Sequence, residues 1–507
     1  MMSMKLRFLV FVFFALNITS VAQQPKQSIR GKITDAMTGI PVPFATIIVL
    51  ETEPMLGTVA DEKGSFNLIN VPVGRYDIQV SCIGYEPKKI KEVLVTSAKE
   101  NYLNVTIQES VNVLDAVVIK PTVSKEVPLN KMAVVSARML SVEEANRYAG
   151  GFDDPARLVS AFAGVASNTG NNGIVVRGNS PRMLLWKMEG IEIPNPNHFA
   201  DINTFGGGAL TALSSNLLAN SDFFTGAFPA EYNNALSGVF DIAMRTGNAQ
   251  NFENSFQLGI IGIDFASEGP LGKSGLSSYL FNYRYSTLSL VQPILPEDAE
   301  KINFQDLSFK INLPLRTKGS FKLWGIGLTD KSGQTAIPDS TKWKYIGDKE
   351  DGTPIQYMGA LGLTYFTYFK NNTSIKTTAA VTSNGLDWKI KRLNNELHLL
   401  PQREIQSKNH NLVFTSSITK KFSNAHSNKT GFTFTGLHYK SIIKDILNMD
   451  VTPTELVNEN GFSYLMAFYT SSAFRLSQSI QLTLGINNQL FTLNGNYSLE
   501  PRLGLKW

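Results

Sequence analysis

The second half of the chain alternates apolar and polar residues with the period of two that is typical of a β-strand with unlike surroundings on its two faces. The alternation recurs in LSFKINL (residues 307–313) and SIQLTLGIN (residues 479–487). In SSYLFNYRYS the aromatic positions are Tyr279, Phe281, Tyr283 and Tyr285, opposite Asn282 and Arg284. Segments of about ten residues with this alternation are typical of transmembrane barrels. The pattern predicts an antiparallel transmembrane β-barrel over residues 250–507.

The lengths of the connections support this interpretation over a soluble sandwich or propeller, whose strands also alternate. Outer-membrane barrels have short periplasmic turns and longer external loops in strict alternation. A soluble fold has no reason to show the same alternation. Short connections are expected near residues 269–275, 314–319, 371–373, 422–429 and 476–478, and long ones near residues 289–302, 331–356, 389–408 and 444–460.

Residues 23–110 show shorter strands with closely spaced turns. Turn residues gather at 35–39, 61–64 and 72–74, and apolar positions alternate between them. Short strands with regular turn signals predict a small β-sandwich.

Residues 136–249 mix the two kinds of pattern. DDPARLVSAFAGV (residues 153–165) predicts a short helix, with Asp153 or Asp154 as its cap and Pro155 in its first turn. Short apolar strands broken by Gly and Pro follow, so this region is expected to be a compact α+β unit.

The N-terminus carries Lys5 and Arg7, an apolar run from Phe8 to Leu16, and then Ser20-Val21-Ala22. This order is typical of a secretory signal peptide at residues 1–22. The run is too short for a membrane anchor, which needs about 20 apolar residues. The sequence therefore predicts an exported, mainly β protein.

Composition narrows the possible functions. The net charge of +5 is small for 507 residues, and no basic stripe with interleaved aromatic residues is present, so a nucleic-acid partner is not expected. The five histidines are scattered without zinc-ligand spacing. SEGPLGKS (residues 267–274) has Ser267 where a phosphate-binding loop needs its first Gly. We expect no catalytic, cofactor-binding or metal-binding residues, and no enzyme activity.

Two stretches carry a resemblance to known families. GKITDAMTGIPVPFA, GTVADEKGSF, GRY and IGY resemble the carboxypeptidase regulatory-like domain, which implies no peptidase activity. IVVRGNSPRMLLWKMEGIEIPNP (residues 174–196) resembles the plug domain of TonB-dependent outer-membrane receptors of the Bacteroidetes type. The plug motif falls on Arg177, Gly178, Asn179, Pro181, Glu189 and Gly190, with Glu189 where Asp is usual.

The linker, residues 111–135, holds the apolar, strand-prone peptide LDAVVI. The resemblance implies that this peptide is the TonB box, which would add as a strand to the sheet of TonB. Ala116 departs from the polar or acidic residue that is common there. The alternative is a last strand of the preceding sandwich, and the residues alone leave both open. The candidate box comprises Leu114, Asp115, Ala116, Val117, Val118 and Ile119.

The spacing of the alternating segments gives roughly twelve strands. A barrel that holds a separate plug domain needs about 22 strands. We therefore expect an incomplete barrel and an N-terminal part of a longer receptor.

The resemblance implies import of a ligand too large for porins, driven by the proton-motive force through TonB and its inner-membrane energising complex. The receptor would lie in the lipid of the outer membrane, with the regulatory-like domain and linker in the periplasm. An iron chelate, an oligosaccharide or a peptide are candidate ligands. A surface lipoprotein partner is not indicated. The plug residues proposed to reach the ligand are Asn195, Asn197, His198 and Phe199.

Other interpretations remain. Arg177, Arg182 and Lys187 are expected to contact the polar inner face of the barrel. An exported surface binding or adhesion protein without transport activity would use the same signal and sandwich. A secreted hydrolase is disfavoured because the sequence offers no nucleophile or metal cluster.

Overall fold

The computed structural model describes residues 25–507 apart from residues 98, 111–127, 149–150, 152–153, 168–171, 201–205, 260–261, 273–274, 288–301, 316–317, 334, 447–451 and 478. The expected signal peptide at residues 1–22 and the candidate TonB box at residues 114–119 lie outside the described residues. Within them, no helix has the length and apolar character needed to cross a membrane.

Residues 26–107 form the expected β-sandwich, with one sheet of order β4-β1-β7 and a second of order β3-β2-β5-β6. Alternate residues of both sheets point inward, and Ile29, Ile33, Ile47 and Ile78 are fully buried between them. Burying this apolar surface holds the two sheets together. The strands are β1 (Lys26–Asp35), β2 (Thr46–Val49), β3 (Leu56–Val59), β4 (Ser65–Pro72), β5 (Gly74–Ser81), β6 (Lys88–Val95) and β7 (Asn101–Ile107).

The plug is built on a five-stranded sheet of order β12-β11-β16-β15-β8. One face carries Trp186, whose ring stacks on Phe240 at 4.1 Å between centroids. The strands of the sheet are β8 (Ala137–Leu140), β11 (Leu185–Met188), β12 (Ile191–Ile193), β15 (Ser221–Phe224) and β16 (Val239–Ile242). Two short pairs join it, β9 (Val165–Ala166) with β10 (Val175–Val176) and β13 (Asn197–His198) with β14 (Leu210–Thr211).

Among the residues described, the plug also contains the short helices α2 (Val142–Arg147), η1 (Pro155–Ala161) and η2 (Pro181–Met183). The helix expected at residues 153–165 is the 3-10 helix η1, and Asp154 caps it by accepting from the Ala156 N–H at 3.0 Å. The expected α+β character of this region is therefore present, and the predicted helix is shorter than the sequence suggested.

The remaining strands form one large antiparallel sheet, called the wall below. Twelve of its thirteen strands pair in chain order, and β22 (Glu350–Gly352) pairs only with β24. This agrees with the roughly twelve strands expected from the sequence. The strands in order are β17 (Glu253–Leu258), β18 (Gly262–Pro270), β19 (Ser278–Ser286), β20 (Asn303–Pro314), β21 (Ser320–Lys331), β23 (Ile355–Phe369), β24 (Thr373–Leu393), β25 (Leu399–Ser423), β26 (His426–Asp445), β27 (Thr454–Arg475), β28 (Gln481–Phe491) and β29 (Asn496–Lys506).

The predicted alternation in the wall is confirmed. In β20, Leu307 and Leu313 are exposed on the outer face, whereas Ser308 and Lys310 are buried on the inner face against the plug. Trp324 and Ile326 of β21 pack in the same apolar core as the plug residues. The inner face is therefore partly apolar where it holds the plug and polar elsewhere.

The prediction of long loops is wrong at two places. Most of residues 389–408 and 444–460 are not loops, because β24 to β27 run for 20 to 25 residues each: β25 begins at Leu399, β26 continues to Asp445 and β27 begins at Thr454. In this part of the hairpins both faces are at least partly exposed, so the residues need not alternate in polarity. The connection between β21 and β23 does contain irregular structure, with η4 (Ser340–Lys342) and η5 (Ile346–Lys349).

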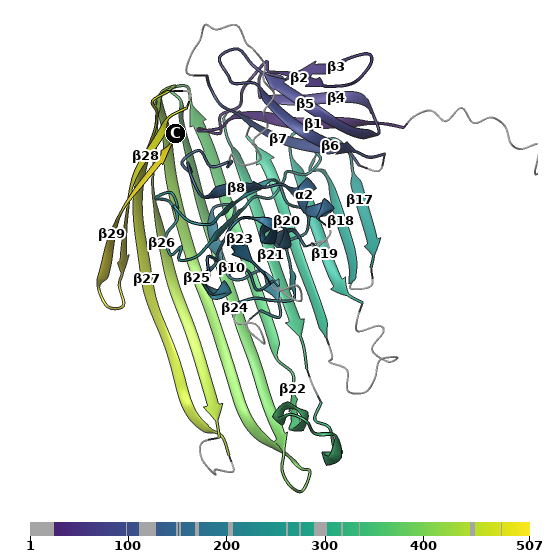
Figure 1. Ribbon diagram of the computed structural model, residues 1–507, viewed down its shortest axis with the longest axis vertical. Coiled ribbons are helices and arrows are strands. Elements are labelled where there is room, and N and C mark those ends of the chain that lie inside the picture. Colours follow the sequence, from purple (N-terminus) through teal and green to yellow (C-terminus); the bar gives the residue numbers. More distant parts are fainter. Residues whose placement is uncertain are drawn as a thin grey trace, which may run out of the picture.

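Figure 1 shows how the three parts are arranged. The plug lies against the curved wall, and the long hairpins of β24 to β27 project at the lower end. The sandwich lies at the upper end, where the short turns join the strands.

Candidate functional site

The contact between plug and wall centres on the turn at Glu189 and Gly190. These residues join β11 to β12, and their φ angles of +53° and +92° are those of a two-residue hairpin turn. The Glu189 carboxylate accepts from the Lys310 ammonium of the wall at 2.6 Å and from the Met244 N–H at 3.0 Å. The Lys376 ammonium donates to the Glu189 carbonyl at 2.9 Å. The plug motif thus places a buried carboxylate between two lysines of the wall.

The basic residues Arg177 and Lys187, which precede this turn, have partners other than those expected from the sequence. The Arg177 guanidinium donates to the Ser136 hydroxyl at 3.4 Å, within the plug. The Lys187 ammonium lies 4.7 Å from the ring centroid of Tyr232, also in the plug. The predicted wall contact of Arg177 and Lys187 is therefore wrong, and Glu189 makes the contact instead.

The rest of the motif shapes the turn before β11. Arg177 and Gly178 both have positive φ, at +52° and +82°. The Asn179 amide donates to the Val176 carbonyl at 3.1 Å, and Pro181 opens η2. These residues fix the backbone and line no cavity that the structure describes.

A second plug–wall contact surrounds His198. Its Nε2 lies 2.9 Å from an Asp306 carboxylate oxygen of β20, and its Nδ1 lies 3.4 Å from an Asp330 oxygen of β21. The Phe199 N–H donates to the same Asp330 oxygen at 3.0 Å. Burial alone lowers the pKa of His198, but the hydrogen bonds to both carboxylates outweigh it and the pKa is raised. The buried His198 ring therefore joins the plug to two wall strands through Asp306 and Asp330.

These positions bear on the proposed ligand-facing loop. Asn197 and His198 are 0% exposed, so neither side chain meets open solvent. Asn195 donates to the Gly206 and Gly207 carbonyls at 2.9 and 3.0 Å. Ligand contact by this loop stays a prediction, and it can rest only on Asn195 and Phe199, which are partly exposed.

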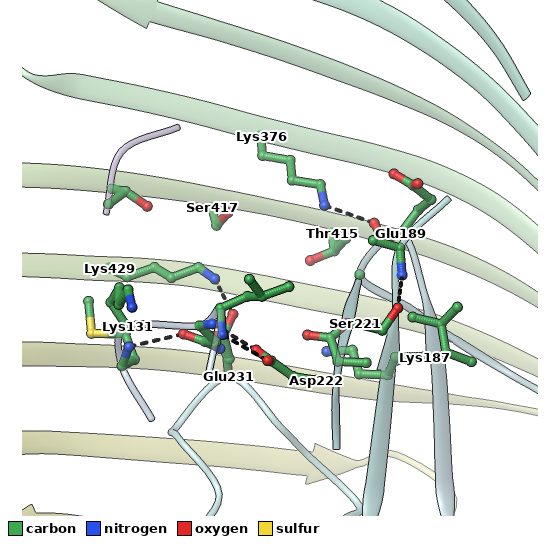
Figure 2. A pocket seen from close by; sticks show the side chains of 18 of the residues that line it. Lys131, Lys187, Glu189, Ser221, Asp222, Glu231, Lys376, Thr415, Ser417 and Lys429 are labelled. Carbon is green, nitrogen blue, oxygen red and sulfur yellow. Dashed lines mark hydrogen bonds and ion pairs between the residues drawn. The ribbon is translucent and has the colours of Figure 1, made fainter. Parts of the chain in front are cut away.

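A polar cavity of about 340 Å³ separates the plug sheet from β24 to β27 (Figure 2). Hydroxyl groups of Thr378, Thr415, Ser417 and Thr433 line it on the wall side. Strand pairing brings Lys187, Asp241 and Asp222 into one row on the plug side. The segment 129–132 and two residues of the sandwich, Ala36 and Met37, also line the cavity.

Asp222 ties the end of the linker to the plug sheet. Its carboxylate accepts from the Leu129 N–H at 2.8 Å and from the Asn130 N–H at 2.7 Å. Burial raises the pKa of Asp222 to about 7, against the lowering effect of those two hydrogen bonds. The Asn130 side chain also donates to Glu231 at 2.6 Å, and Glu231 forms an ion pair with Lys429 of the wall. The chain that leaves the linker is thus fastened to both plug and wall.

Sequence reasoning missed the partners on the wall, namely Lys310, Asp306 and Asp330. The alternation did place Lys310 on the inner face of its strand, where a charge needs a partner. No signal in the sequence identified that partner, which lies 121 residues away. Within the described part of the chain, no group of three or more His, Cys, Asp or Glu residues is arranged to hold a metal ion.

Comparison with solved structures defines the class of fold. The chain is similar to a variant of the ferric enterobactin receptor of Pseudomonas aeruginosa (12% identity, TM-score 0.51, covering 73% of this chain and 59% of that one). It is similar to the siderophore receptor PirA of Acinetobacter baumannii (15%, 0.54, 73% and 58%). The outer membrane transporter YddB of Escherichia coli is a third match (11%, 0.50, 73% and 58%). The chain thus spans about three fifths of the length of these proteins. No curated protein matches it in sequence.

The chain therefore has the fold of these receptors over the part that it spans, and the resemblance to TonB-dependent receptors is confirmed for the fold. At the N-terminal end, residues 29–119 match the CarboxypepD_reg-like domain family. The combination of that domain with a receptor fold is the one expected from the sequence.

Proposed function

We propose that the protein imports a ligand too large for porins across the outer membrane, with energy from TonB. The observation that carries the proposal is the plug sheet fastened inside a receptor wall by Glu189–Lys310 and by His198 with its two carboxylates. A plug held by a few buried polar contacts closes the path at rest. It can also be displaced as a unit when those contacts break.

The energy would enter through the linker. In the proposed mechanism, TonB pairs with residues 114–119 as an added strand and pulls. The pull reaches the plug where residues 129 and 130 are bound to Asp222. Asp222 lies on β15, which pairs with the edge strand β8, so the first strand to be loaded is the second strand from the edge of the sheet.

An iron chelate is the ligand class to test first, since two of the solved relatives are titled as receptors for ferric enterobactin or a siderophore. An oligosaccharide or a peptide remains an alternative. We further propose that the protein resides in the outer membrane with the sandwich in the periplasm, and that it has no enzymatic activity.

Deletion of residues 114–119 tests the function. Cells that lack their own siderophore receptors would express the protein, and binding and uptake of radiolabelled ferric enterobactin and other ferric siderophores would be measured. We expect surface binding to persist and uptake to be lost, because only the energy input is removed. Deletion of residues 121–126 of the same linker is the matched control and should retain uptake. Uptake by the 114–119 deletion equal to that of the unaltered protein would contradict the proposal.

A further inference from the structure

The sandwich is fastened to the wall by a buried ion pair at the short-turn end of β25. The Lys421 ammonium lies 2.5 Å from a Glu109 carboxylate oxygen and 3.4 Å from an Asp35 oxygen. The side chains of Lys421 and Asp35 are only 7% and 6% exposed. Removing one partner of such a pair leaves an uncompensated buried charge, so the contact resists separation.

A second strand of the wall, separated from β25 by β26, repeats the contact. At the end of β27, Arg475 donates to the Glu109 carbonyl at 2.6 Å and forms an ion pair with Glu86. Between these strands, the Asn424 amide donates to the Ser110 carbonyl at 3.2 Å. We call Lys421, Asn424 and Arg475 the latch.

The opposite edge of the sandwich is also attached. Glu100 accepts from the side chains of Asn248 and Asn251 at 2.9 Å each, and Lys99 lies 2.8 Å from Glu268 of β18. Arg147 of the plug helix α2 pairs with Glu92 at 2.6 Å. The sandwich is therefore held at both sides of the wall and by the plug between them.

The turn after β1 occupies the space between these attachments. Ala36 and Met37 line the cavity between plug and wall. Gly39 has φ +69°, and a Cβ on it would lie 3.4 Å from the Phe366 ring of β23. The turn thus reaches over the wall and lies at the end of the cavity nearest the short turns.

We propose that the sandwich is a cap that closes the short-turn mouth of the cavity between plug and wall. While the latch holds, the turn at residues 36–39 covers the hydroxyl-lined wall of β24 to β26. A ligand that passes between plug and wall towards the short turns meets the cap at this end of the cavity. The role of the cap rests on the proposed function, because closing an exit is useful only to a transporter. The contacts that hold the cap in place do not depend on transport.

Chemical labelling inside the cavity tests the cap without any ligand. Ser417 lines the cavity, and Cys82 is the only cysteine of the sequence. The full-length protein with Cys82→Ser and Ser417→Cys would be purified in detergent and treated with N-ethylmaleimide, which is uncharged and does not respond to charge changes. Adding Lys421→Glu and Arg475→Glu should speed the labelling by about tenfold or more, because the buried pairs that seat the cap are lost.

Two matched variants control for other effects. Lys420→Glu changes the adjacent charge, but the Lys420 ammonium bonds the Asn371 carbonyl on the wall and should leave labelling slow. Lys421→Glu with Glu109→Lys reverses the pair and should slow the labelling again. Heat-modifiable migration on a gel checks that each variant is folded. Equal labelling rates with and without the latch would overturn the cap, whether or not the protein imports a ligand. If the protein imports no ligand but labelling is fast only when the latch is broken, the proposed function is contradicted and the cap is supported.

Discussion

At the scale of single residues, the plug is held by charges that have left water. Glu189 and Lys310 are 7% and 4% exposed, so each depends on the other for compensation. Such pairs add little compared with a well-packed apolar pair, yet they are costly to break singly. These ion pairs therefore determine the position of the plug against the wall more than they raise the free energy of unfolding.

Lys310→Met should lower the free energy of unfolding by about 3–5 kcal/mol, because the Glu189 carboxylate is left buried without its cation. The double variant Glu189→Gln with Lys310→Met should recover most of that loss. Arg403→Ala is the comparison, since its pair with Asp445 is exposed and should contribute at most about 1 kcal/mol. Urea unfolding in detergent measures all three. Equal losses for Lys310→Met and Arg403→Ala would show that Glu189 does not hold the plug.

His198 makes the seating of the plug depend on pH. Its folded pKa is raised, so the stabilisation is complete below the unfolded value of about 6.5 and is lost as the pH rises through the folded pKa. As the pH rises above about 6.5, the melting temperature should fall by more than it does in His198→Gln. If the two curves run parallel, the imidazolium is not part of the contact.

At the scale of elements, alternation found the wall strands because the plug on one face and different surroundings on the other impose period two. It did not find the full length of β24 to β27, since the outer parts of these hairpins are at least partly exposed on both faces. Short apolar strands broken by Gly and Pro were expected in residues 136–249, and the turn at Glu189 and Gly190 is one of these breaks. The partners of this turn on the wall were not expected, because pairing across some hundred residues leaves no local pattern.

Substitutions on the outer face of these strands test whether that face lies in lipid. Leu412 of β25 is 58% exposed on that face. Leu412→Arg should cost about 2–4 kcal/mol on folding into lipid vesicles if the residue lies near the bilayer midplane. Asn411→Arg, on the opposite face, should cost clearly less. A matching cost for both variants would contradict the assignment of the faces.

At the scale of the whole molecule, three parts share one interface at the short-turn end. Residue types and turn spacing were enough to predict the sandwich, the plug and the wall separately. Their attachment was not predictable, because each contact uses a common surface residue such as Lys421 or Glu109 whose partner is set only by the assembled fold. The linker end, the plug and the cap all border the same cavity.

The attachment of the cap also constrains the order of assembly. Asp35 and Lys421 are 386 residues apart in the chain, and Glu86 and Arg475 are 389 apart. The sandwich can fold by itself as soon as it is synthesised, since its own contacts are local. The sandwich can dock on the wall only after β25 and β27 have been synthesised and paired, because contacts of such long sequence separation form late. The sandwich is therefore translated before the strands on which it docks, and it reaches its final place only after they have paired.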